Sequence, residues 1–389
     1  MTNAIIKTLW DSRLWHGPAP KVILLLAVVN IAVLRWKSSM VEEKHANLTV
    51  GDVKALNQSA RYDYTFGEDL LASWGSIPDA TKQPLVVLSG MSQMYAINEP
   101  KPGDQRISEW LDDRLSLRGV RVYGLAAPNL CNEEALFLLL ALLERPQTTP
   151  RSFIYGVCFD KFRNMDLRPG YIKFFLANPH LATVWKQVAE EQGERYPLAA
   201  EKMLKTFHDL HIEEDHDRPM SGTCENRLRD LIGAGVPVVA ERKYLNGFIQ
   251  NRLYTLRNSL LGIKNTSKRP IIRARYDMNR QFLELMMDIS KQAGVQFIAY
   301  IIPLNPCAEN PYILQEYKEF KTWLEDLAAA RRVPFANLEN LVPTEEWGMW
   351  MGGPDFKHFK GAGHRRVATK LEEEFGPLLT ASTDLEAAP

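Results

Sequence analysis

Short apolar runs and helical patterns alternate along two stretches of the chain. Residues 85–88, 120–125 and 152–159 are apolar runs of strand length. After a long interruption, residues 295–302 form a fourth such run, and residues 333–341 give a shorter last one. Runs without alternating polar positions are typical of strands that are buried on both faces, as in a parallel sheet.

Helical spacing fills the stretches between these runs. We predict helices at residues 104–117, 132–145, 277–293, 312–332 and 364–378. Strands that alternate with helices favour crossover connections, which place helices over both faces of one sheet. The sequence therefore predicts an α/β fold with three layers, α/β/α, and a mostly parallel sheet of the flavodoxin-like kind.

Residues 164–263 interrupt this alternation. They are rich in charge, Pro and His and contain no clear strand, so we predict a helical insertion over the sheet and a candidate lid. The last part, residues 238–263, has the spacing of a long amphipathic helix. The predicted organisation is a tail with an anchor helix (1–40), a linker and lead-in (41–83), the α/β domain with its insertion (84–379) and a polar tail (380–389).

One segment near the N-terminus is apolar enough to enter a membrane. Residues 22–34 read VILLLAVVNIAVL, which is shorter than the roughly 20 residues that span a bilayer. A signal-peptide core and a buried core helix are the alternatives. Charged flanks at Lys21, Arg35 and Lys37 isolate the segment and favour a signal anchor. We therefore expect a single-pass membrane protein whose domain lies outside the cytoplasm, in the periplasm or outside the cell.

Composition and charge argue against nucleic-acid partners and metal sites. Lys plus Arg equals Asp plus Glu at 47 each, so no net field draws the chain to nucleic acid. The cysteines, Cys131, Cys158, Cys224 and Cys307, show no zinc-ligand spacing, and Cys158 falls in an apolar run as a buried thiol would. The acidic run at 213–217 favours a solvated face over a metal site, and we expect neither metal nor cofactor.

Two stretches carry residues suited to nucleophilic chemistry. Ser89 and Ser92 follow the first apolar run, where a serine either caps a helix or is exposed as a nucleophile. Asp355 and His358 lie three residues apart, on a predicted loop or turn just before the closing helix. At this spacing the carboxylate can hold His358 Nδ1 and leave Nε2 to accept a serine proton. A surface histidine beside an acid is the alternative interpretation.

Short blocks of the chain resemble the SGNH, or GDSL-type, hydrolase superfamily. A strand followed by Gly-x-Ser matches the segment that ends in Ser92, so the resemblance assigns the nucleophile to Ser92 and not to Ser89. A strand ending in Gly matches Gly124, and Asp-x-x-His followed by Gly and a helix matches Asp355 and His358. The resemblance runs from about residue 84 to about residue 379 and is interrupted by the insertion.

Within the superfamily, the chain is most similar to the membrane-anchored branch that includes the D-alanine transfer protein DltD and the alginate O-acetylation proteins. The stretch 300–306, a strand followed by Pro-x-Asn-Pro, carries this resemblance, and its Asn305 is a further candidate for oxyanion or substrate contact. Two positions depart from the superfamily. Met91 replaces a polar residue, and Cys158 stands where the superfamily has the Asn that supplies an oxyanion donor.

Three other residues are candidates for the crevice. Asn129 is either a substitute oxyanion donor or a turn residue after the second strand. Asp160 and Arg163 follow the third strand and either line the crevice or form a surface ion pair.

The resemblance implies acyl transfer through Ser92, His358 and Asp355, with the Ser92 and Gly124 backbone N–H groups receiving the oxyanion. It also implies a glycan or acyl-ester substrate of the cell envelope and a membrane O-acyltransferase as partner. We expect an anchored serine acyltransferase or esterase. The alternatives are an ordinary anchored carbohydrate or lipid esterase and a catalytically inactive scaffold of a polysaccharide-modification complex.

Overall fold

The computed structural model describes residues 62–64, 74–127, 129–163, 166–216, 267–350 and 353–381. The predicted anchor segment 22–34 and the predicted amphipathic helix 238–263 lie outside these residues. Among the described residues, no helix combines the length and the apolar character needed to cross a membrane. The chain divides into two compact units, and the fold described is that of the unit formed by Leu56–Ile212 and Asn265–Pro389. The predicted domain boundaries stay a prediction.

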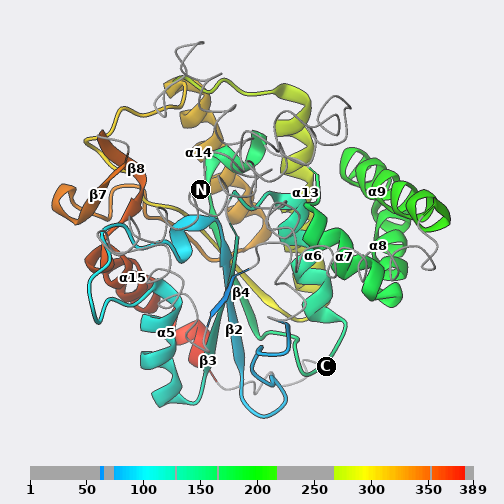
Figure 1. Cartoon of the computed structure of the whole chain (residues 1–389), viewed down its shortest axis with the longest axis horizontal. Helices are drawn as coiled ribbons and strands as arrows, with labels where there is room; N and C mark the ends of the chain where they lie inside the picture. The colour runs from blue at the N-terminus through cyan, green and yellow to red at the C-terminus, as the bar shows by residue number, and fades with distance from the viewer. Residues whose placement is uncertain are drawn as a thin grey trace, which may run out of the picture. The chain divides into compact units, whose positions relative to one another are not determined.

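A six-stranded parallel sheet forms the centre of this unit (Figure 1). Its strands, in spatial order, are β1 (Tyr62–Tyr64), β3 (Arg121–Ala126), β2 (Leu85–Gly90), β4 (Ser152–Val157), β5 (Gln296–Ile301) and β6 (Phe335–Asn337). Without β1, the order of the other five is 2-1-3-4-5, the order of flavodoxin-like doubly wound sheets. The predicted α/β fold with a parallel sheet is confirmed.

The lead-in contains a strand that the sequence did not indicate. β1 pairs with residues Gly124 to Ala126 of β3, although it lies in the stretch 41–83 predicted as linker. Its three residues, Tyr-Asp-Tyr, form an edge strand, which can alternate in polarity and be very short.

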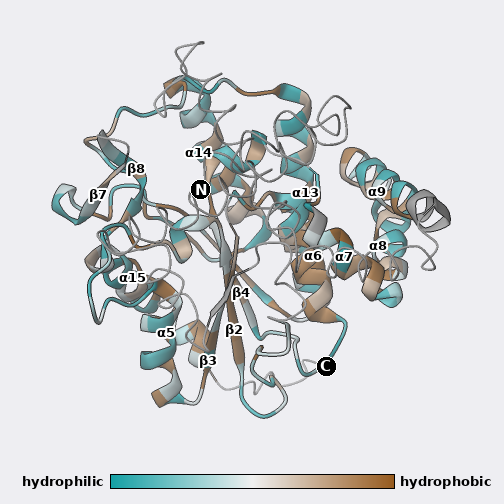
Figure 2. Cartoon of the chain, viewed as in Figure 1, coloured by the Kyte–Doolittle hydropathy of each residue, from teal (hydrophilic) through white to brown (hydrophobic). Residues whose placement is uncertain are grey.

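Helices cover both faces of the sheet because successive side chains of each strand point in opposite directions. Val87, Tyr155 and Ala299 belong to one buried cluster, and Leu88, Ile154 and Tyr300 belong to another. One face packs against α6 (Asn132–Leu143), α13 (Arg273–Gln292) and α14 (Leu314–Arg331), and the other against α5 (Ile107–Leu115) and α15 (Gly361–Thr380). The central strands and α6 are accordingly the brown, apolar elements of Figure 2.

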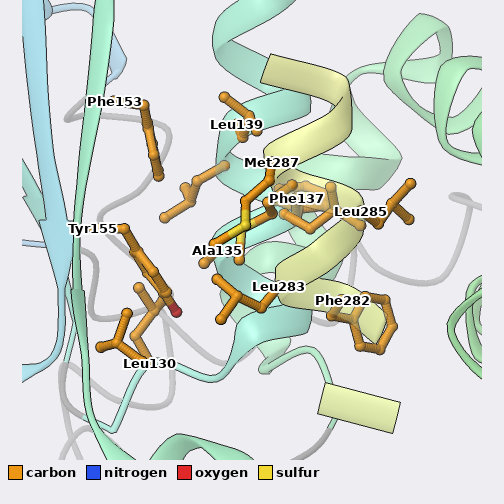
Figure 3. Packing of buried hydrophobic residues seen from close by; sticks show 14 of the residues in the cluster. Leu130, Ala135, Phe137, Leu139, Phe153, Tyr155, Phe282, Leu283, Leu285 and Met287 are labelled. Carbon is orange, nitrogen blue, oxygen red and sulfur yellow. The ribbon is translucent and has the colours of Figure 1, made fainter. Parts of the chain in front are cut away.

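The face on the α6 side is filled by large side chains. Figure 3 shows Phe153 and Tyr155 of β4 pointing toward α6 and α13, with Met287 between these helices. Tyr155 keeps a polar partner in this layer, because its hydroxyl donates to Asn132 Oδ1 at 2.7 Å. The predicted helices at 132–145, 277–293 and 312–332 are therefore confirmed, with ends that differ by a few residues.

The described part of the interruption consists of helices that pack beside α6. These are α7 (Pro169–Ala177), α8 (Pro179–Gln192) and α9 (Pro197–His216). Arg168 holds the start of α7 to Glu134 of α6 through bonds of 2.5 and 2.7 Å. Glu133 accepts from Thr206 of α9 at 3.2 Å, and burial raises the pKa of its carboxyl to about 7.

A small antiparallel hairpin lies outside the main sheet. It is formed by β7 (Trp347–Trp350) and β8 (Gly353–Phe359). Asp355 and His358 therefore lie on a strand, and the prediction that they lie on a loop or turn was wrong. The pairing of Trp347 with Phe359 and of Met349 with Pro354 holds this strand, so the two side chains have a fixed backbone.

Candidate active site

Ser92 lies where the chain leaves the central strand β2. Gly90 ends the strand, and a Cβ atom on Gly90 would lie 2.9 Å from Met94 Cγ, so the glycine allows the tight return of the chain. The chain after the strand forms a single 3-10 turn, Ser92–Met94. The first N–H groups of such a turn have no acceptor inside it. The Ser92 hydroxyl therefore belongs to a residue at the start of a helical turn, where backbone N–H groups lack an acceptor inside the turn.

The strand order places this turn at the switch point of the sheet. The crossover from β2 leads to β3 on one side of β2, and the next crossover runs from β3 back past β2 to β4 on its other side. Crevices at such points are the common ligand sites of doubly wound folds.

Three side chains form a hydrogen-bonded chain at this edge. Ser92 Oγ lies 2.8 Å from His358 Nε2, and His358 Nδ1 lies 2.9 Å from Asp355 Oδ2. With Asp355 ionised, Nδ1 carries the proton that it donates to the carboxylate, and Nε2 keeps a lone pair for the serine hydroxyl. The His358 side chain is 27% exposed, so the ring remains accessible from solvent.

Both oxygens of the Asp355 carboxylate accept hydrogen bonds. Its Oδ1 accepts from the N–H groups of Lys357 at 2.9 Å and of His358 at 3.2 Å. Burial alone would raise the pKa of Asp355. The hydrogen bond and charge of His358, together with the two backbone N–H groups, outweigh burial and lower that pKa. Asp355 is therefore a fixed anion behind the histidine.

Gly124 does not lie at this edge. It pairs with Leu88 of β2 and Tyr62 of β1, inside the sheet, and β3 continues to Ala126. The expectation that its N–H receives an oxyanion does not fit this position, because a backbone N–H inside a sheet faces a neighbouring strand.

Asn129 follows β3 in a tight turn next to the Ser92 turn. The Ala127 N–H donates to Gly90 O at 3.2 Å, so the two loops leave the sheet side by side. Leu130 N donates to Ala127 O at 3.2 Å, and Asn129 has φ of 50°, a left-handed conformation that Asn tolerates better than most residues. Asn129 thus lies in a turn, and its side chain is exposed.

Asp160 is buried in an ion network rather than lining a crevice. Its carboxylate lies 2.6 Å from Lys357 Nζ and 2.8 Å from Arg269 Nη1. Burial would raise its pKa, but these two cations outweigh burial and lower it. Arg163 makes no ion-pair contact with Asp160, although its charge interacts with those of Asp160 and Arg269. Its carbonyl accepts from Arg275, and its buried Nε has no hydrogen-bond partner among the described residues. The network links β8 to the segment around Arg269.

Asn305 makes hydrogen bonds to the backbone of β8. Its Nδ2 donates to Asp355 O at 2.8 Å, and its N–H donates to Phe356 O at 3.2 Å. Its Oδ1 accepts from Cys307 N at 2.9 Å, so both the oxygen and the nitrogen of the buried amide have a hydrogen-bond partner. Asn305 therefore fixes the backbone at Asp355 through hydrogen bonds, and its side chain does not face a substrate position.

Two amide side chains that contact the site were not predicted from the sequence, although both follow closely after Ser92. Gln93 Nε2 donates to Pro303 O at 2.8 Å and to Lys357 O at 2.6 Å, and the side chain is fully buried. Asn98 Nδ2 donates to Asp355 Oδ2 at 3.2 Å. No sequence signal distinguishes such amides, because their partners lie some 250 residues away.

The two departures from the superfamily offer no side-chain donor at the site. Cys158 is a buried thiol, as predicted, and its Sγ lies 3.5 Å from the Tyr312 hydroxyl. Met91 is fully buried among apolar residues. Among the described residues, no group of three His, Cys, Asp or Glu side chains could hold a metal ion.

A second histidine near the site, which is fully buried, makes the fold sensitive to acid. His364 is 0% exposed, its Nε2 lies 3.3 Å from Ala96 O, and its Nδ1 has no partner within the described part of the chain. Burial, with smaller effects of nearby positive charges, lowers its pKa from 6.5 to about 3. The unfolded chain therefore takes up a proton below pH 6.5 that the folded chain refuses, so stability is lost as the pH falls from 6.5 toward 3.

We expect His364→Gln to remove this part of the acid sensitivity. Between pH 7.5 and pH 5.0, the loss in free energy of unfolding should be about 2 kcal/mol smaller in the variant than in the wild type. Urea unfolding at the two pH values measures the difference. His208→Gln, at an exposed position, is the control and should behave like the wild type. An unchanged loss in His364→Gln would contradict the prediction.

The fold and the site together define a class: an α/β protein with a Ser–His–Asp chain at the carboxyl edge of a parallel sheet. No family model and no curated protein matches the sequence. Among solved structures, the chain is similar to a GDSL-like lipase of Bacteroides thetaiotaomicron, with 10% identity over 78% of this chain and 92% of that one and a TM-score of 0.35.

It is also similar to the psychrotrophic esterase EstA of a Pseudoalteromonas species, with 10% identity over 76% of this chain and 98% of that one and a TM-score of 0.36.

Proposed function

We propose that this protein is an SGNH-type serine esterase or O-acyltransferase that uses Ser92, His358 and Asp355. The single observation that carries the proposal is the continuous contact from Ser92 Oγ through His358 to the Asp355 carboxylate, at 2.8 and 2.9 Å. These distances are within hydrogen-bond reach, which is the first requirement for a nucleophile and its base.

The geometry supplies each proton transfer of acyl transfer. His358 Nε2 takes the Ser92 Oγ proton as Oγ attacks the ester carbonyl carbon. The bond to the leaving alcohol breaks, and Nε2–H returns that proton to the alcohol oxygen. Water or an acceptor hydroxyl then attacks the acyl-Ser92, its proton passes to Nε2, and Ser92 is released with its own proton restored.

Backbone groups are the donors that we assign to the oxyanion. The N–H groups of Ser92 and Gln93 begin the 3-10 turn and have no acceptor inside it. The N–H of Asn129 is the third candidate, because its turn leaves the sheet beside the Ser92 turn. Such donors aimed at the developing charge are a main source of rate acceleration in acyl transfer.

The finer proposal is an anchored enzyme acting outside the cytoplasm on a cell-envelope or exported glycan, with a membrane O-acyltransferase as partner. The resemblance of residues 300–306 to the DltD-like branch and the apolar segment 22–34 support it. An inactive scaffold is the second candidate. The observation that favours it is the buried Cys158 thiol at the position of the usual Asn donor.

A serine-reactive fluorophosphonate probe tests the proposal. We expect the wild type to be labelled and Ser92→Ala not to be labelled. Ser89→Ala is the matched control, because Ser89 is 0% exposed and its Oγ has no partner among the described residues. Labelling that survives in Ser92→Ala would reject the nucleophile, and an unlabelled wild type would favour the scaffold. Product analysis with a glycan acceptor present then separates transferase from esterase.

A further inference from the structure

Within the described part of the chain, the Asp355 carboxylate has one side-chain donor besides His358. Asn98 Nδ2 lies 3.2 Å from Oδ2, the same oxygen that accepts from His358 Nδ1 at 2.9 Å. The other oxygen is occupied by two backbone N–H groups. Asn98 therefore completes the set of donors that fixes the rotation of the carboxylate.

Asn98 is itself tied to the hairpin that carries Asp355. Its N–H donates to Phe359 O of β8 at 2.9 Å, and its Nδ2 also lies 3.3 Å from Met349 O of β7. The residue thus bridges the segment that follows Ser92 and both strands of the hairpin. Asn98 therefore couples the nucleophile half of the site to the half that holds the base, as Gln93 does through its bond to Lys357 O.

The Asn98 carboxamide packs directly against Gly348 of β7. A Cβ atom on Gly348 would lie 2.1, 2.3 and 2.6 Å from the Asn98 Cγ, Oδ1 and Nδ2 atoms. These are its nearest atoms, and real Cβ atoms do not approach so closely. They form the end of a flexible side chain, so a methyl group at 348 would push the carboxamide aside rather than break the hairpin.

We propose that Asn98 is a positioning residue for Asp355. We also propose that the lack of a side chain at Gly348 leaves the space in which the Asn98 carboxamide is held. The inference deepens the proposed function and rests on it. When the Asn98 donor is present, the carboxylate keeps the rotation at which Oδ2 faces His358 Nδ1. When it is absent, Oδ2 loses a donor and the carboxylate turns more freely, so the ring is aligned with Ser92 for less of the time.

The test uses four variants of the full chain: Asn98→Ala, Gly348→Ala, the double variant and Gly353→Ala. Gly353 lies in the same hairpin, and a Cβ there would meet no atom within 4 Å, so it is the matched control. The rate of fluorophosphonate labelling and the kcat and KM for p-nitrophenyl acetate report on the reaction. The low-field proton NMR signal of His358 Nδ1–H reports on alignment without requiring turnover.

We expect each single variant to lower kcat by about tenfold to a hundredfold with KM unchanged, since each removes a hydrogen bond to a charged group. The double variant should be no worse than Asn98→Ala, because the displaced carboxamide is already gone. The low-field signal should move in both single variants and stay in Gly353→Ala. Thermal unfolding midpoints identify any variant that has lost its fold.

An Asn98→Ala protein with wild-type kcat and an unchanged signal would overturn the inference while leaving the proposed function intact. Losses that multiply in the double variant would overturn the assignment of Gly348. If the wild type is not labelled but its low-field signal still responds to Asn98→Ala, the positioning role stands and the proposed function fails.

Discussion

Asp355→Asn is expected to lower kcat for ester hydrolysis by about 10³–10⁴-fold, as loss of the carboxylate does in other Ser–His–Asp sites. The reason lies in the two backbone donors. Oδ1 accepts from the N–H groups of Lys357 and His358, so the oxygen of the new amide stays there and its NH₂ group takes the place of Oδ2. That NH₂ faces His358 Nδ1 and selects the tautomer with the proton on Nε2. Such a ring cannot accept the Ser92 proton.

The measurement is kcat with p-nitrophenyl acetate, with circular dichroism to show that the fold is retained. Asp277→Asn is the control, because that carboxylate is paired with Arg273 on the surface of α13, away from the site. A loss smaller than tenfold in Asp355→Asn would show that the carboxylate does not act through the histidine tautomer.

Phe137→Ala is expected to lower the free energy of unfolding by about 3–5 kcal/mol. The ring is 0% exposed on α6 and contacts rings of both α7 and α8: its centroid lies 5.6 Å from that of Phe175 and 5.9 Å from that of Trp185. Removing it leaves a cavity and takes away the contacts that join the helices of the interruption to the layer over the sheet.

Urea unfolding followed by circular dichroism measures this loss. Leu117→Ala is the matched control, since Leu117 is 88% exposed and should change the free energy by less than about 0.5 kcal/mol. A change below about 1.5 kcal/mol in Phe137→Ala would mean that α7 and α8 do not depend on this ring.

The strands and helices of the sheet could be predicted because burial on both faces leaves an unbroken apolar run. β2 reads LVVLSG and is buried at every position. β1 and the β7–β8 hairpin could not be predicted in the same way. Tyr-Asp-Tyr is too short to show a period, and residues 347–359 mix Gly, Pro and charge, so that pairing rather than pattern determines their structure.

Part of the site could also be predicted from the sequence. The spacing of Asp355 and His358 predicted their contact, because three residues of chain bring a short carboxylate to the near nitrogen of the ring. The sequence predicted a strand end at Gly124, because a glycine after an apolar run is typical of one. In the structure, β3 continues past Gly124. Gln93 and Asn98 could not be found, because what an amide contacts is decided by the tertiary fold.

The distance along the chain between Ser92 and His358 has a consequence for synthesis of the protein. The two residues are separated by 266 positions. A ribosome that has just added Ser92 must therefore add 266 more residues before His358 is in the chain. Until then the growing polypeptide lacks the base that contacts Ser92 in the folded protein, and a product that ends before His358 never acquires it.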